Sequence, residues 1–581
     1  MQVFLDGFLV LQKHLVGVTV FWVSVLGMGV WLAHYVPIDE KHRALLVPFS
    51  LSAGVVALTL VSFVLVLLGH VWPQIWVPGS VLVVVWAVAN IILRLWRNRM
   101  WSIRLSHMGI FILGLLAGLL LLIIRLAFMQ GMLLPPYSDS AEHYMIVRDL
   151  LSPTGTQTAS YSLGSIADRY YHFGFHSLTA WLVSVAGLDA SMTMALLGQT
   201  FLVISPLAVM FFIGVTTEDG RAALFAALLA GAGWRMPAYA ANWGKYPALA
   251  GVVTFPVILA VLYLCFRASN KKMAALTSAI LLLMGAVLFH TRILICLFLA
   301  GLSFLLALVI TARLKDRARI WAAIAITILA AAFSIRHLGL ALMYWDRQWI
   351  ALGALLVLLP FACIHFPRFS FGTALFALGL ILASKAPLPD LLQISSPVLL
   401  DRPFLEISFY LPLSVLWGLG ASGLLKKLSG KMLLARSVFV LLIALVFLNA
   451  GVVDSFYPDP CCDFVKRIDL YAIDWIADEL PEDAVILISG YQVRDYLIGT
   501  DAGVWIRPLT GNQTRKKPYD FAWDSPDVLG EICQFGNVYV YAGGMYYSFD
   551  KSRLSKPEWY QPVFGSRGTK IYHVVACSAG N

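Results

Sequence analysis

Long apolar segments recur along this chain and limit what it can fold into. Windows of about 20 residues with few or no charges, each followed by a short polar connection, are typical of α-helices that cross a membrane. Of the 581 residues, 60% are hydrophobic and only 13% are charged, which is far less charge than a soluble protein of this length carries. The pattern predicts a polytopic α-helical membrane protein with about 14 spanning helices. The first apolar stretch has no small-residue cleavage site, so we expect it to remain as a helix.

The basic residues predict how the helices are oriented. The net charge of +10 does not indicate nucleic-acid binding, because the basic residues gather in connections between apolar segments, as the positive-inside rule expects. The strongest basic connections lie at 94–104, 267–272, 313–319 and 426–436. If these are cytoplasmic, the connection after the fourth span lies outside. The order holds only if the short apolar run 172–183 does not cross the membrane, so we interpret it as a re-entrant or surface helix.

Residues 135–148 form a polar stretch directly after the fourth apolar segment. Pro135 and Pro136 end the preceding helix, and a new helix can be capped at residue 138 or 139. On that helix Asp139, Glu142 and His143 stand at positions i, i+3 and i+4, so we expect them to share a face. Such a titratable cluster at the edge of a membrane domain favours chemistry. The alternative is a capping box of Asp139 and Glu142 with a purely structural role.

Further polar residues at the ends of apolar segments are predicted on the same outer side. The full set is Asp139, Glu142, His143, His172, His176, Lys245, His290, Arg292, Asp346, Arg347, Asp401 and Arg402. Ionisable residues that converge on one face favour a polar cavity near the outer leaflet. For any single Arg or Lys the alternative is a side chain that reaches the lipid head groups.

The last apolar helix ends near Asn449, and the composition after residue 454 is that of a soluble domain. A helix is predicted at 467–480, and strands at 484–489, 504–509, 537–541, 560–564 and 569–575, the last two as a hairpin pair. This makes an extracytoplasmic α/β domain. It contains four cysteines, at positions 461, 462, 533 and 577. Disulfides are expected in an oxidising space, with three pairings open. A metal site is not expected from this spacing.

Several motifs resemble the GT-C superfamily of membrane glycosyltransferases, which use polyprenyl-phosphate-linked sugars. The similar stretches are Tyr170–Leu178, Asn242–Pro247, Arg402–Gly420 and Ala472–Val485. The resemblance covers roughly residues 105–581, so the predicted organisation is 1–104 as additional N-terminal helices, 105–453 as a GT-C-like core with an outer catalytic loop at 131–171, and 454–581 as the extracytoplasmic domain. The first loop departs from the usual acidic pair, and Lys245 stands where metal-dependent relatives place acids, so a divalent cation is left open and no other cofactor is expected.

The resemblance implies an inverting transfer of a sugar from a polyprenyl-phosphate donor to a glycan, lipid or protein acceptor at the outer face of the plasma membrane. Asp139 would be the catalytic base, with Glu142 as second choice. The residues expected to bind substrate are His143, His172, His176, Lys245, His290, Arg292, Arg347 and Arg402. The alternatives are a transporter or flippase for lipid-linked glycans, a ligase that moves a whole glycan as O-antigen ligases do, and a non-catalytic scaffold.

Overall fold

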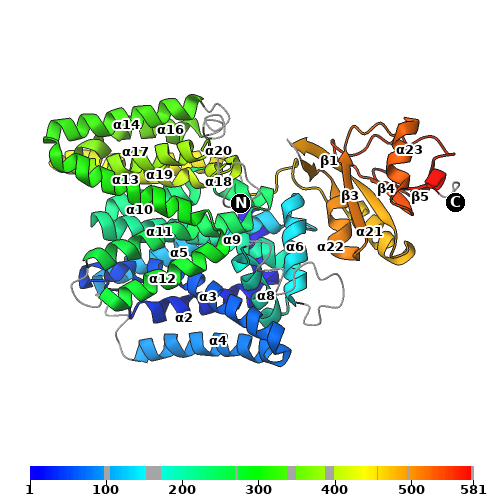
Figure 1. Ribbon diagram of the computed structural model, residues 1–581. Coiled ribbons are helices and arrows are strands. Elements are labelled where there is room, and N and C mark those ends of the chain that lie inside the picture. Colours follow the sequence, from blue (N-terminus) through cyan, green and yellow to red (C-terminus); the bar gives the residue numbers. More distant parts are fainter. Residues whose placement is uncertain are drawn as a thin grey trace.

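The computed structural model describes residues 1–96, 105–151, 172–267, 272–336, 344, 348–386, 398–453, 456–493 and 496–577. Helices occupy the chain up to residue 453, and a smaller α/β domain follows (Figure 1). In the figure this domain stands at one side of the helical body, with α6 at the boundary between the two.

In the first two thirds of the helical body, the described residues form sixteen elements. They are α1 (Gln2–Lys13), α2 (Leu15–Leu32), η1 (Glu40–Leu45), α3 (Leu46–Val71), α4 (Pro73–Trp96), α5 (Leu105–Leu126), η2 (Ala127–Met129), α6 (Ser138–Leu151), α8 (Gly174–Ala186), α9 (Ala190–Thr217), α10 (Gly220–Leu228), η3 (Leu229–Gly233), η4 (Ala238–Trp243), α11 (Tyr246–Arg267), α12 (Lys272–Phe289) and α13 (Ile293–Arg313). The rest contains α14 (Asp316–Arg336), α16 (Trp349–His365), α17 (Pro367–Ala383), α18 (Arg402–Ser408), α19 (Tyr410–Lys427) and α20 (Met432–Val453).

The helical body has the dimensions of a polytopic membrane protein. Within the described residues, ten helices are long and apolar enough to cross a membrane, and four further apolar helices have 10–17 residues. The hydropathy windows predicted about fourteen spans. One of the short helices is α8, whose 13 residues extend only about 20 Å, less than the hydrocarbon thickness. The membrane class and the short helix at this position are therefore confirmed.

Close packing through small residues joins the N-terminal helices to the body. A side chain at Gly29 would lie 1.8 Å from the backbone oxygen of Ser50, and one at Gly54 would lie 1.9 Å from that of Val25. These glycines allow α2 and α3 to approach at backbone distance, as is common where helices pack in lipid. Helix α3 in turn packs on α8, α9 and α12.

Helix α11 separates two chemically different ends of the body. It begins directly after Lys245 and ends at Arg267, so its 22 residues place these two positions about 33 Å apart along the helix axis. At the Arg267 end, Glu218 pairs with Arg267 and Asp219 pairs with Lys426. Arg267 and Lys426, which belong to two of the four basic connections predicted to be cytoplasmic, thus meet at the end opposite to Lys245.

The C-terminal domain is built on a six-stranded mixed sheet. Its elements are α21 (Arg467–Glu479), β1 (Val485–Val493), β2 (Tyr496–Gly499), η6 (Ala502–Trp505), α22 (Ile506–Thr510), β3 (Gln513–Pro518), α23 (Pro526–Cys533), β4 (Val538–Ala542), β5 (Tyr560–Gly565), β6 (Lys570–Val574) and η7 (Val575–Cys577). The strand order is β2-β1-β4-β6-β5, and β3 also pairs with β1. Strands β3 and β4 are parallel to β1, while β2, β5 and β6 make antiparallel pairs.

Most predicted elements of this domain are confirmed, but the strand at 504–509 is wrong. That stretch forms η6 and α22, where Asp501 caps the turn by accepting a hydrogen bond from the Gly503 amide at 3.0 Å. Trp505 and Ile506 are fully buried, and a short buried apolar run looks the same in a helix as in a strand. Pro508 also lacks the amide that a central strand needs. Strand β3 was missed because its sequence, Gln513–Pro518, is polar.

Of the disulfide bonds that the sequence left open, the structure forms one. Cys533 and Cys577 form a disulfide that closes a loop between residues 44 positions apart. Cys461 and Cys462 are free thiols in this structure, with their sulfur atoms 2.6 Å apart. They lie in the connection between α20 and the C-terminal domain.

This domain is anchored on α6. Leu134 and Ala141 belong to the same buried cluster as Ile473 and Trp505 of the C-terminal domain. The Tyr144 ring meets the Trp505 ring at 5.6 Å, and another residue of α6, Arg148, donates a hydrogen bond of 2.7 Å to the Pro508 carbonyl. The domain therefore helps to position the helix that carries Asp139.

A buried carboxyl makes the stability of the C-terminal domain depend on pH. Burial raises the pKa of Asp501 to about 6, against hydrogen bonds from Ser548, Ser489 and Gly503 and with a smaller contribution from Asp469. A raised carboxyl pKa gives stability that is complete below pH 3.8 and is lost as the pH rises through about 6. We expect this group to cost about 2 kcal/mol at pH 8 relative to pH 4. Hydrogen exchange of β1 and β4, corrected for intrinsic rates, measures the change, which Asp501→Asn should remove.

Candidate active site

The helix α6 begins at a sharply fixed point. Tyr137 precedes it with φ 69°, a left-handed conformation that is rare outside glycine. Its amide donates a hydrogen bond of 2.9 Å to the Cys462 carbonyl, and its ring lies 5.6 Å from that of Phe464. The Ser140 hydroxyl donates to the Pro136 carbonyl at 2.5 Å. The chain thus turns into α6 under constraints from both the proline pair and the connection to the C-terminal domain.

Asp139 in the first turn of α6 forms an ion pair with Lys245. Burial opposes the charge on Lys245, but the Asp139 carboxylate outweighs it and raises the Lys245 pKa, with smaller contributions from Asp401 and Tyr496. The side chains remain 28% and 33% exposed for Asp139 and Lys245, respectively. Lys245 is therefore charged near neutral pH, and the ion pair is partly open to a ligand.

Four histidines surround this ion pair. His143 lies one turn after Asp139. Its Nδ1 atom is 3.0 Å from the Nε2 atom of His176 in α8, and one of these two nitrogens donates a hydrogen bond to the other. The rings of His172 and His290 lie 4.2 Å apart. Burial, with nearby Lys245, lowers the pKa of His143 to about 3, and burial, with Arg292, lowers that of His172 to about 4. Both imidazoles are therefore neutral at physiological pH and serve as hydrogen-bonding groups, not as charges.

A second ion pair closes the other side of the cluster. Arg292, directly before α13, contacts the Asp401 carboxylate at 2.5 Å. Asp401 also caps α18, because it accepts a hydrogen bond of 2.9 Å from the Phe404 amide. The Phe404 ring lies 4.8 Å from that of His290. Three separate connections, before α11, α13 and α18, thus contribute to one polar cluster.

Two predicted residues point elsewhere. The prediction that Glu142 shares a face with Asp139 and His143 is wrong: its side chain is 54% exposed and lies 3.8 Å from Lys516 of β3. Positions i+3 and i+4 flank position i on opposite sides of a helix, about 100° apart, and only the His143 flank faces the cluster. Arg402 is 69% exposed and pairs with Glu406 at 2.7 Å. The predicted Arg347, like Asp346, lies outside the described residues.

Some residues of the site were not predicted. Gly244 has φ 62°, and a Cβ there would lie 2.5 Å from the Ser140 hydroxyl oxygen and 2.7 Å from its amide nitrogen. It allows η4 to touch the start of α6, which brings Lys245 to Asp139. Gly174 plays a similar part, because a Cβ would lie 2.7 Å from the Leu288 backbone. The glycine next to Lys245 and the one before His176 were the available signals.

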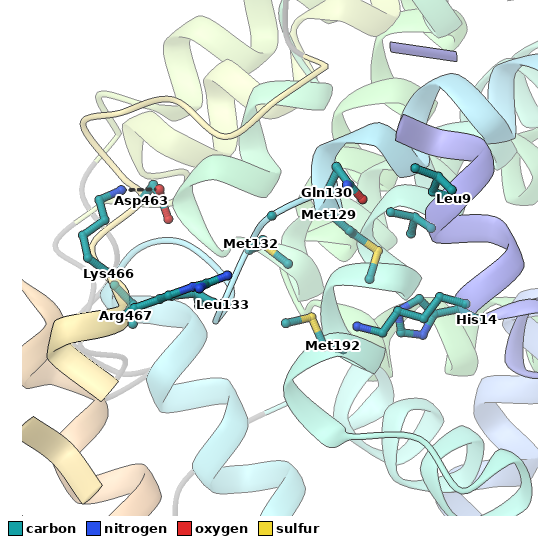
Figure 2. Close-up of a pocket in the computed structure, with 14 residues that line it drawn as sticks. Leu9, His14, Met129, Gln130, Met132, Leu133, Met192, Asp463, Lys466 and Arg467 are labelled. Carbon is teal, nitrogen blue, oxygen red and sulfur yellow. Dashed lines mark hydrogen bonds and ion pairs between the residues drawn. The ribbon is translucent and has the colours of Figure 1, made fainter. Parts of the chain in front are cut away.

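Within the part of the chain that the structure describes, no group of three or more His, Cys, Asp or Glu could hold a metal ion. The two carboxylates of the cluster are instead paired with cations, Asp139 with Lys245 and Asp401 with Arg292. A separate pocket of about 540 Å³ lies between α1 and the start of the C-terminal domain (Figure 2). Its lining includes Lys13, Met129 and Arg467, and none of the cluster residues.

The structure therefore defines a polytopic membrane protein with a polar, charge-paired cluster at one end of its helices and a C-terminal α/β domain beside it. The chain belongs to DUF6541, a family of unknown function, whose model matches residues 20–456. The match begins within α2 and ends before α21, the first helix of the C-terminal domain.

Comparisons with other known proteins add little to the site. No curated protein matches the sequence. Among solved structures, the chain is similar to the cryo-EM structure of arabinofuranosyltransferase AftD from Mycobacteria, with 14% identity over 79% of this chain and a TM-score of 0.32. The match spans 39% of the AftD chain. At that TM-score the likeness carries no argument about function, which rests on the residues of the cluster.

A matched pair of glycine variants tests whether the contact at Gly244 positions the ion pair. We expect Gly244→Ala to move α6 away from η4 and to lower any activity of the site by about 10²-fold, as small displacements of catalytic groups do. Gly187 also has a left-handed φ, 63°, but has nothing within 4 Å of its Cβ position. Gly187→Ala therefore carries the backbone strain without the clash. Equal losses in both variants would assign the effect to strain alone.

Proposed function

We propose that this protein is an inverting glycosyltransferase that moves a sugar from a polyprenyl-phosphate donor to an acceptor at the outer face of the plasma membrane. The observation that carries the proposal is the Asp139–Lys245 ion pair, partly open and surrounded by neutral histidines at the helix ends. It combines a base and a cation, the two groups that this reaction needs. The resemblance of the surrounding motifs to GT-C enzymes supports the same class.

Asp139 would act as the base. In the transfer, the acceptor hydroxyl oxygen forms a bond to the anomeric carbon while the bond from that carbon to the phosphate oxygen breaks. The proton of the hydroxyl passes to the Asp139 carboxylate, and the bonding electrons leave with the lipid phosphate. The leaving group is already an anion, so it needs no general acid.

Lys245 would bind the phosphate of the donor. In the free protein it pairs with the Asp139 carboxylate, which is thereby engaged. A bound phosphate would offer Lys245 a second anion, so part of its charge would shift from Asp139 to the donor. Arg292 is held close by through Asp401 and would add a second cation to the same phosphate. Donor binding and activation of the base would thus be coupled through one lysine.

The neutral histidines suit sugar hydroxyls. A neutral imidazole has one donor and one acceptor nitrogen, and so it can bind a hydroxyl without adding positive charge next to the anomeric carbon. His172 is the most accessible of the four, being only partly buried, and would meet the sugar first. His143 and His176, which are buried and hydrogen-bonded to each other, would form the buried side of the site.

The test is donor consumption by the purified protein in liposomes, with a panel of polyprenyl-phosphate hexoses and pentoses and a membrane extract as acceptor. Consumption of one donor by the wild type, with none by Asp139→Asn, supports the proposal and identifies the sugar. If lipid-linked sugar crosses the bilayer without being consumed, the protein is a transporter. Transfer of a whole glycan from a lipid diphosphate would make it a ligase.

A further inference from the structure

The C-terminal domain carries a cluster of tyrosine rings that its own core does not use. Tyr491 stacks on Tyr519 with centroids 6.0 Å apart and planes inclined by 15°. Tyr547 meets Tyr491 at 5.5 Å and Tyr519 at 5.0 Å, both edge to face, and Tyr546 lies 4.9 Å from Tyr547. We call these four residues the tyrosine platform.

The platform is exposed although aromatic rings of this size usually contribute to a core. Tyr491 is 46% exposed, Tyr547 is 42% and Tyr546 is 88%. None of the four belongs to the buried clusters of the domain. Exposed aromatic rings that contact one another form a contiguous apolar patch, which is a mark of an interaction site.

The position of the platform in the sheet is that of a binding site. Tyr491 lies near the carboxyl end of β1, Tyr519 follows β3, and Tyr546 and Tyr547 follow β4. These three strands are parallel, and open α/β sheets bind ligands beyond the carboxyl ends of such strands. The backbone holds the rings there: the Tyr519 amide donates to the Gly490 carbonyl at 2.8 Å, and the Thr500 hydroxyl to the Tyr547 carbonyl at 2.7 Å.

The platform is linked to the candidate active site through the pairing of β1 with β2. Strand β1 continues from Tyr491 to Val493, which pairs with Tyr496 of β2. Tyr496 is 59% exposed, and its phenol is close enough to Lys245 to influence the charge of that side chain. The strand that carries one ring of the platform therefore pairs with a strand that reaches the Asp139–Lys245 pair.

We propose that the tyrosine platform binds sugar rings of a glycan acceptor and directs its end toward Asp139; this rests on the proposed function. The C–H face of a sugar packs on an aromatic face, and the phenol groups can bond its hydroxyls. A carboxylate, Asp520, adjoins Tyr519 and can accept hydrogen bonds from sugar hydroxyls, and Arg553, which donates to the Asp520 carbonyl at 3.3 Å, can donate them. The lysines of β3 are engaged elsewhere: Lys516 with Glu142 and Lys517 with Glu531.

The first test is direct binding to the full-length protein in lipid nanodiscs. Saturation-transfer NMR would measure binding of maltohexaose, mannohexaose, xylohexaose and arabinohexaose, with a neutral soluble peptide as the control ligand. We expect at least one oligosaccharide to bind, and Tyr491→Ala with Tyr519→Ala to weaken it by about tenfold. The double variant with phenylalanine at both positions should keep most of the affinity, because it keeps the ring faces. Tyr471→Ala is the matched control, since Tyr471 is 63% exposed on α21 and outside the platform.

The second test separates this inference from the proposed function. In the transfer assay, the double alanine variant should raise the KM for the acceptor and leave donor hydrolysis and kcat near wild type. Binding of oligosaccharide without any transfer would support the platform and reject the glycosyltransferase. Transfer with an unchanged acceptor KM, or failure of the wild type to bind any of the four oligosaccharides, overturns the platform. Equal thermal unfolding of the variants shows that the rings are not needed for folding.

Discussion

Asp139→Asn should abolish transfer while the protein still folds and still binds its donor. Removal of a general base typically costs 10²–10⁴-fold, and we expect about 10³-fold here in kcat, because a carboxamide cannot accept the acceptor proton. The substitution keeps the shape of the side chain, and an ion pair that is about one-third exposed contributes little to stability. Thermal unfolding should therefore stay within a few degrees of wild type. The assay is single-turnover transfer from saturating donor, with donor binding measured separately.

Glu142→Gln is the matched control for this variant. It removes a carboxylate three residues further along the same helix, with the same change in charge, from a side chain that is 54% exposed and faces Lys516. We expect its rate to stay within about twofold of wild type, since mutations of surface charge away from a site have small effects. If Glu142→Gln were inactive and Asp139→Asn active, the base would be Glu142. Two active variants would reject a carboxylate base on α6.

The coarse architecture could be read from the sequence because it depends on periodic and compositional signals. Apolar windows indicated the spanning helices, and their charged ends indicated which of them share a side. That reasoning placed Asp139, Lys245, His290 and Arg292 together, as the structure does. The change in composition after residue 454 located the C-terminal domain. Each of these signals is a sum over many residues, so single exceptions did not matter.

The sequence did not predict the features that depend on a single contact. Whether Glu142 or His143 faces the site depends on the rotation of α6, which is set by its packing against α8 and the C-terminal domain. The run at 504–509 folds as a helix because of a single cap and one proline. The tyrosine platform brings together residues from one strand and two connections, and no spacing along the chain indicates that they meet.

The second large effect concerns Lys245, which pairs with Asp139 and which, in the proposed function, binds the donor phosphate. We expect Lys245→Met to weaken donor binding by about 10²-fold, because loss of one partner of a desolvated charge pair costs 2–5 kcal/mol. Methionine keeps the length and apolar stem of lysine, so the close approach of Gly244 to Ser140 should survive. The kcat should also fall, since the phosphate loses a cation as its charge develops. Titration with a fluorescent polyprenyl phosphate measures the first effect, and single-turnover transfer the second.

Arg402→Met distinguishes a specific role of Lys245 from a general attraction of the site for anions. It removes one positive charge from a helix end on the same face, but Arg402 is 69% exposed and already paired with Glu406. If Lys245 acts by contact, only Lys245→Met weakens the binding, and Lys245→Arg restores part of it. If the site acts only through its net charge, both methionine variants weaken binding equally and 1 M salt removes the difference from wild type, because exposed charges are screened within about 3 Å at that concentration. If Lys245→Met still weakens donor binding in 1 M salt, Lys245 is the phosphate ligand. Since the same side chain pairs with Asp139, donor binding would then be the event that frees the base.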